Sequence, residues 1–107
     1  MLIDTHCHLN YLHGLDLDAL RSTLKEASAA KVDHCICIGV DLPQLHEVLT
    51  IAEAFDQVKA SVGVHPCSVS EHPFAEAIAT LRKHVQLPDV VAVGECGLDY
   101  YREEGLD

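Results

Sequence analysis

Apolar residues lie along the chain in short runs that alternate with longer amphipathic stretches. Four runs have the length and continuity of buried β-strands: residues 2–8, 34–39, 58–64 and 90–96. Between them, apolar side chains recur at steps of three and four residues, which is the spacing of one buried helical face. This spacing predicts helices over residues 17–31, 42–52 and 74–85. The expected order of elements is therefore β-α-β-α-β-α-β.

Polar residues mark where two of these helices begin. Asp16 and Asp18 lie at the amino end of the first helix, where negative charge interacts favourably with the helix dipole. Asp41 is a predicted N-cap of the second helix, with Gln44 at the third helical position. Strands and helices thus follow one another directly, without a linker or a repeated sequence.

This alternation predicts an α/β fold with parallel strands, because parallel strands need long crossover connections. Two architectures fit: an open doubly wound sheet, or the first half of a TIM-type (β/α)8 barrel, which typically takes about 250 residues. The first strand-to-helix turn, residues 6–14, has a single glycine and so no glycine-rich phosphate loop. We therefore expect residues 1–107 to form a single, incomplete (β/α) barrel domain.

Composition supports a compact protein and narrows its location. Hydrophobic residues make up 49% of the 107 residues and charged residues 22%, which is the balance of a globular chain. Apolar runs fall short of the roughly 18 residues of a membrane span, and the first residues lack the features of a signal peptide. We expect a cytoplasmic protein without membrane contact. Its five cysteines, odd in number and without CxxC spacing, are expected to be mostly buried free thiols.

Charge and histidine content restrict the chemistry further. Lys and Arg number 7 against 17 Asp and Glu, which gives a net charge of −10. Such a chain does not bind nucleic acid through basic side chains alone, so a role with nucleic acid would need metal ions. Eight histidines are many for this length and favour metal chemistry.

His6 and His8 are candidate metal ligands at the end of the first strand. Residues two apart in a strand share a face, so both rings lie on the same side as Asp4. Two neutral imidazoles placed in this way converge on one cation. The alternative is that both histidines face solvent at a strand exit.

Two later strands also end in polar residues. Glu95 lies between Gly94 and Gly97, which allow a sharp turn and close backbone approach. A metal is a more economical partner for this carboxylate than one of the few basic residues, although a salt bridge is the alternative. Asp99 either orients a ligand or caps a following helix. His65 binds a substrate phosphate or a metal, or is a loop histidine. The histidines on predicted helices, His46, His72 and His84, are expected to be solvent-exposed.

Three segments taken together resemble the TatD family of metal-dependent deoxyribonucleases. They are DTHCHL at 4–9, GVHP at 63–66 and GECGLDYY at 94–101. The resemblance covers nearly the whole chain, in order. It implies a metal site formed by His6, His8 and Glu95, with Glu95 bridging to a second metal and thus catalytic. It also implies that His65 contacts the substrate phosphate and that Asp99 and Tyr100 shape the substrate site.

By this resemblance the protein hydrolyses DNA phosphodiester bonds with two divalent metal ions, Mg²⁺, Mn²⁺ or Zn²⁺, which activate water. The family's later ligands lie in the second half of the barrel, so this chain is expected to carry only part of the site. Two alternatives remain open. One is a non-catalytic metal-binding half-barrel that self-associates through open sheet edges. The other is a different HxH metallohydrolase that acts on an ester or an amide.

Overall fold

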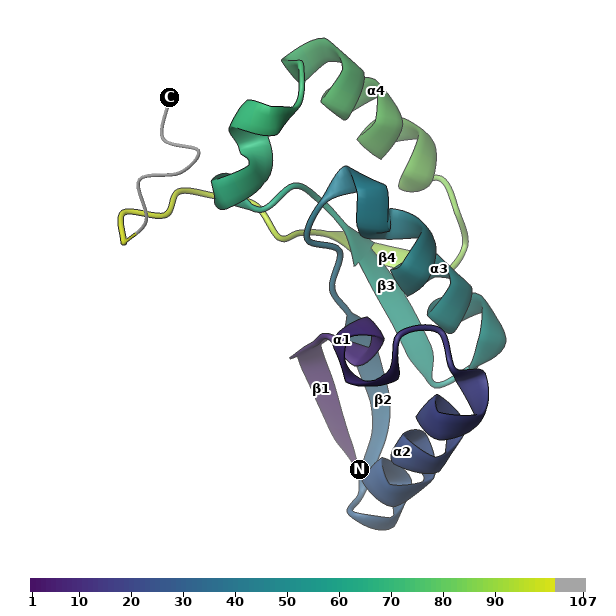
Figure 1. The fold of residues 1–107 in the computed structure, drawn as a ribbon. Helices are drawn as coiled ribbons and strands as arrows, with labels where there is room; N and C mark the ends of the chain where they lie inside the picture. The colour runs from purple at the N-terminus through teal and green to yellow at the C-terminus, as the bar shows by residue number, and fades with distance from the viewer. Residues whose placement is uncertain (102–107) are drawn as a thin grey trace.

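The computed structural model describes residues 1–101, which form one parallel sheet in the order β1-β2-β3-β4 (Figure 1). The strands are β1 (Leu2–Cys7), β2 (Val32–Cys37), β3 (Val58–Val62) and β4 (Val90–Val93). The helices are α1 (Leu9–His13), α2 (Leu17–Ala29), α3 (Leu45–Ala54) and α4 (Phe74–His84), with 3-10 turns η1 (Leu42–Gln44) and η2 (Pro66–Glu71). Within this range, none of the helices has the length and apolar character to cross a membrane.

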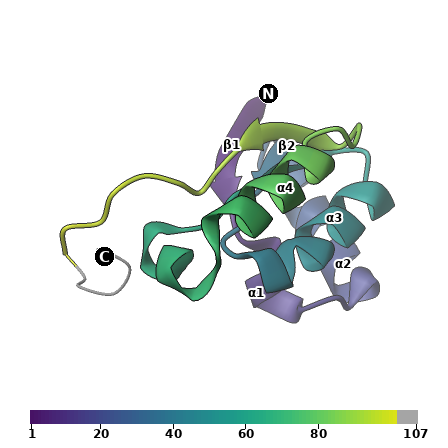
Figure 2. The same ribbon diagram turned by 90° about the horizontal axis from the view of Figure 1, so that it is seen from above.

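The strand order identifies the fold as half of a (β/α)8 barrel. Each strand pairs in parallel with the next along the chain, so the sheet grows in one direction only. A doubly wound sheet reverses its strand order at a switch point and places helices on both faces. Here the helices lie on one side of the sheet, as Figure 2 shows. The predicted fold class is confirmed.

The core lies between the central strands and helices α2 and α3. Its buried apolar side chains come from both layers, among them Leu20, Val48, Ile51, Val58 and Ala60. Burial of a side chain as large as leucine or isoleucine stabilises a fold by about 1.5–3 kcal/mol. The central strands are therefore the most firmly held part of the sheet, and the outer strands that carry the site described below pair with them.

The outer strands are more exposed than their sequence predicts. Ile3 in β1 is 57% exposed and Val93 in β4 is 61% exposed. The reason is that helices cover only one face of the sheet, whereas the opposite face and both edges lack neighbours within the described residues. Helix α4 likewise keeps an amphipathic pattern but leaves Phe74 80% exposed. The apolar runs identify the strands correctly but not their burial.

Helix α1 is an element that the sequence pattern does not reveal. It has five residues and begins without a side-chain cap, so the usual start signals are absent. Its Asn10 is buried, donates a hydrogen bond to Glu47 Oε2 at 3.1 Å and accepts one from the Cys37 thiol at 3.8 Å. Tertiary contacts with β2 and α3 thus stabilise a helix too short to be stable alone.

All five cysteines are free, as predicted, but only Cys35 and Cys37 are buried. Cys7 is half-buried and its thiol donates to the Ile36 carbonyl at 3.3 Å. Hydrogen bonds to the thiols of Cys35 and Cys37, together with burial, raise the pKa of Cys7 above its usual value. Cys7 therefore behaves as a protonated core side chain.

The unequal burial of the sheet predicts unequal effects of the same substitution. Ile51→Ala removes a fully buried side chain from α3 and should lower the free energy of unfolding by about 2–5 kcal/mol. Ile3→Ala, at an exposed position of β1, should lower it by less than about 1 kcal/mol. Urea denaturation followed by circular dichroism measures both. Equal losses would contradict the placement of the core.

Candidate metal centre

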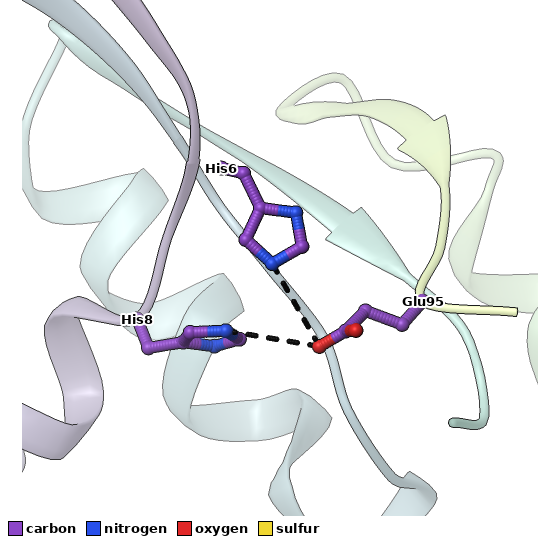
Figure 3. A group of neighbouring side chains, drawn as sticks. All are labelled: His6, His8 and Glu95. Atoms are coloured by element: carbon purple, nitrogen blue, oxygen red, sulfur yellow. Dashed lines mark ion pairs between the residues drawn. The ribbon is translucent and has the colours of Figure 1, made fainter. Parts of the chain in front are cut away.

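Three predicted ligands converge at the carboxyl edge of the sheet. His6 lies in β1, His8 follows it, and Glu95 follows β4. Figure 3 shows the three side chains pointing toward one another from the two outer strands. One ligand atom from each lies within 4.8 Å of the others. Parallel strands end at the same edge of a sheet, which is where barrel enzymes place their catalytic groups.

The separations between these side chains suit a shared cation. Glu95 Oε2 lies 3.8 Å from His6 Nε2 and 3.7 Å from His8 Nε2. Both distances exceed a hydrogen bond, which is about 2.7–3.2 Å. Two atoms that each bind one zinc ion at about 2.1 Å are at most about 4.2 Å apart. Two imidazole nitrogens and one carboxylate oxygen therefore have both the chemistry and the spacing of a divalent cation site.

Aromatic contacts orient His8. Its ring stacks on Tyr11, with centroids 5.0 Å apart and planes 12° from parallel, and meets the His6 ring edge-on at 5.1 Å. Its Nδ1 is buried and has no hydrogen-bond partner among the described residues. Stacking thus sets the orientation of a ring whose Nε2 faces Glu95.

Tyr11 is a site residue that the sequence pattern does not reveal. It is held in turn by a hydrogen bond from its hydroxyl to Gln44 Oε1 at 3.3 Å. Burial raises the pKa of the Tyr11 hydroxyl above its usual value, and the Glu95 carboxylate acts in the same direction. The hydroxyl therefore stays a donor. In the sequence, Tyr11 could have been identified as an aromatic residue within one helical turn of the HxH pair.

Backbone contacts fix the position of Glu95. Its N–H donates to the Gly39 carbonyl at 2.8 Å, and the Gly94 N–H donates to the Val62 carbonyl at 2.9 Å. The buried hydroxyl of Ser61 donates to the Gly94 carbonyl at 2.9 Å. The segment that carries Glu95 is thus tied to the ends of both β2 and β3.

A glycine on the neighbouring strand allows this close approach. A Cβ atom at Gly63 would lie 2.4 Å from the Glu95 carbonyl oxygen, whereas a Cβ at Gly94 would meet nothing within 4 Å. Gly97 adopts a φ of +128°, a conformation that favours glycine. The predicted turn therefore lies at Gly97, but the glycine required for packing is Gly63.

His65 approaches the other oxygen of the same carboxylate. Its Nε2 lies 3.8 Å from Glu95 Oε1. Its Nδ1 accepts the backbone N–H of Cys67 at 3.0 Å, so in the neutral ring the proton lies on Nε2. Nε2 is therefore a hydrogen-bond donor that faces the site. A donor suits an anionic oxygen better than it suits a metal.

The last predicted residues lie farther along the same segment. Asp99 Oδ1 accepts the Tyr101 N–H at 2.9 Å, and Oδ2 accepts a hydrogen bond from the Cys67 thiol at 3.5 Å. The Tyr100 side chain is 82% exposed, so the structure does not bury it against the metal ligands.

His72, predicted to be solvated, instead pairs with Asp41 at 2.5 Å and is mostly buried.

Comparisons with known proteins agree with this geometry. The family model for TatD related DNase matches residues 3–106. A metal-dependent hydrolase named TatD from Mycobacterium tuberculosis is 37% identical over 106 residues, which cover 99% of this chain and 40% of that protein. The 3'-5' ssDNA/RNA exonuclease TatD of Erwinia tasmaniensis is 36% identical over 80 residues, with coverages of 74% and 30%.

A solved structure also matches. The TatD homologue YJJV from Escherichia coli superimposes with a TM-score of 0.82 at 28% identity, covering 97% of this chain and 40% of that one. Nearly all of this chain is matched in both comparisons, but it spans only about two fifths of the length of these relatives. Family match, fold and the ordered motifs agree, and the chain belongs to the TatD-related DNase family.

Proposed function

We propose that this chain carries the amino-terminal part of a metal-dependent hydrolase site that acts on DNA phosphodiester bonds. The observation that carries the proposal is the cation-sized gap between Glu95 Oε2 and the Nε2 atoms of His6 and His8. Family membership supports it, and the Erwinia tasmaniensis relative is named as an exonuclease of single-stranded DNA and RNA. The metal-dependent hydrolase named TatD in Mycobacterium tuberculosis supports the same class of chemistry.

His6, His8 and Glu95 would hold one divalent ion, Mg²⁺, Mn²⁺ or Zn²⁺. Glu95 Oε1 points away from this group toward His65, so the carboxylate has an oxygen left for a second ion. Divalent ions bound in such a site polarise a phosphoryl oxygen and lower the pKa of water. Glu95 would in this proposal be both a ligand and the catalytic residue, because it would hold the ions that supply charge to the reacting phosphate.

The remaining predicted residues would bind substrate. His65 would donate a hydrogen bond from its Nε2–H to a phosphate oxygen. Nε2 faces the site, and Nδ1 already accepts a hydrogen bond from the Cys67 N–H. Asp99 fixes the loop through its bond to the Tyr101 N–H. Tyr100 exposes its ring, and an exposed ring offers a surface on which a nucleotide base stacks.

The charge of the chain favours a role for the cations in binding as well as in catalysis. A net charge of −10 disfavours the approach of a phosphate backbone at long range. Divalent ions held by the histidines and Glu95 would supply the positive charge that Lys and Arg supply elsewhere. DNA binding should therefore depend on metal, which separates this site from a basic nucleic-acid groove.

A second candidate function has one structural observation in its favour. β1 and β4 are both edge strands, each paired on one side only among the described residues. Open edges invite pairing with another strand. The chain would then act as a metal-binding half-barrel that self-associates, and a second copy would complete the sheet.

The metal assignment predicts which substitutions weaken cation binding. Glu95→Gln and His6→Ala each remove one of three ligands and should lower Mn²⁺ affinity by at least about tenfold. Substitution of a residue that only hydrogen-bonds to a metal ligand already lowers affinity by that much. Glu53→Gln and His46→Ala alter exposed side chains on α3 and should leave the affinity unchanged. Isothermal titration calorimetry measures all four. Equal affinity in all variants would contradict the assignment.

The substrate assignment predicts metal-dependent cleavage of DNA. A barrel that contains this chain should shorten an end-labelled single-stranded DNA in the presence of Mg²⁺ or Mn²⁺, and His6→Ala should abolish this cleavage. The isolated chain should cleave only if a second copy completes the site. A metal-loaded, folded chain that leaves DNA intact but hydrolyses a model ester or amide would contradict the proposal in favour of another metallohydrolase. The mass of the active species, measured by light scattering, tells whether a second copy contributes.

If His65 is a hydrogen-bond donor to the substrate, its substitution should change the KM for DNA but not the affinity for Mn²⁺. His65→Ala should raise the KM for DNA about tenfold or more, since a hydrogen bond to a charged group is lost. His65→Gln keeps an N–H donor and should recover part of the loss. Mn²⁺ affinity at the His6, His8 and Glu95 site should stay unchanged in both variants. A matching loss of that affinity would make His65 a metal ligand there instead.

A further inference from the structure

A second group of ligand atoms lies beside the first and shares no residue with it. A ring nitrogen of His65, the sulfur of Cys67 and a carboxylate oxygen of Asp99 lie within 4.8 Å of one another. His65 and Cys67 lie at the start of η2, and Asp99 lies beyond β4. All three are half-buried. The group therefore joins two loops at the edge of the sheet that carries Glu95.

The sulfur and the carboxylate are already spaced as ligands of one ion. Cys67 Sγ donates to Asp99 Oδ2 at 3.5 Å. A tetrahedral zinc ion with sulfur at about 2.3 Å and oxygen at about 2.1 Å separates these two atoms by about 3.6 Å. A cation would thus replace the thiol proton with little movement of either side chain.

His65 offers the third donor through its unprotonated nitrogen. Nδ1 accepts the Cys67 N–H at 3.0 Å, and Nε2 lies toward Glu95 Oε1 at 3.8 Å. Histidines that bind a metal through one ring nitrogen commonly direct the N–H of the other at a carboxylate, which fixes the ring. For His65, this carboxylate is that of Glu95. A cation at Nδ1 would replace the backbone N–H as the partner of the lone pair.

We propose that His65 Nδ1, Cys67 Sγ and Asp99 Oδ2 form a separate site for a zinc-like cation. Binding forms a sulfur–metal bond and releases the Cys67 proton to solvent, so that one thiolate and one carboxylate balance the two positive charges. Sulfur selects Zn²⁺ over Mg²⁺ and Mn²⁺. The ion would hold His65 with Nε2 directed at Glu95, which makes this a positioning site beside the catalytic one.

Cobalt substitution tests the proposal through the absorption of a thiolate–Co²⁺ bond. Wild type and Cys96→Ser, which alters an exposed cysteine next to Glu95, should both show the near-ultraviolet charge-transfer band on titration with Co²⁺. Cys67→Ser should lose the band, and Asp99→Asn should weaken Co²⁺ binding by at least about tenfold. Circular dichroism checks that each variant is folded.

The readout is independent of hydrolysis and of the first site. His6→Ala, which disrupts the first site, should keep the band, so loss of DNA cleavage with a retained band separates the two proposals. A band that persists in Cys67→Ser would assign the thiolate to another of the five cysteines and overturn the proposal. Absence of the band in the wild type would overturn it as well.

Discussion

The site depends on one close approach between backbones at the carboxyl edge of the sheet. Glu95 faces His6 and His8 because its segment packs against the ends of β2 and β3. The Glu95 N–H donates to the Gly39 carbonyl, and Gly63 has no side chain in the way. The core beneath these strands is formed by α2 and α3. Local sequence thus supplies the ligands, and the packing of the central strands brings them within reach of one cation.

The same edge arranges polar groups around both oxygens of Glu95. The imidazoles of His6 and His8 face Oε2, while His65 faces Oε1 with a nitrogen whose proton is directed at the site. The site therefore consists of imidazole and carboxylate groups, and the chain that carries it has a net charge of −10. Cations bound at this edge would supply the positive charge that attracts a phosphate backbone. Metal binding and substrate binding are for this reason parts of one proposal.

Sequence periodicity predicts the four strands, the three longer helices and the half-barrel, because each depends on local patterns of burial. It does not predict α1, whose Asn10 is stabilised by Glu47 and Cys37 far along the chain. Strand-end position and the HxH spacing predict His6, His8 and Glu95 as neighbours. Ser61 and the Cys67–Asp99 contact depend on residues distant in sequence, so no local pattern indicates them. Burial of β1 is overestimated because an apolar run does not tell which sheet face is covered.

The central claim is that one cation lies between His6, His8 and Glu95. Anomalous diffraction from crystals grown with Mn²⁺ tests it most directly, since the ion is located without reference to activity. The account predicts an anomalous peak within about 2.3 Å of His6 Nε2, His8 Nε2 and Glu95 Oε2. A structure at saturating Mn²⁺ in which these three side chains contact one another without a peak between them would contradict it.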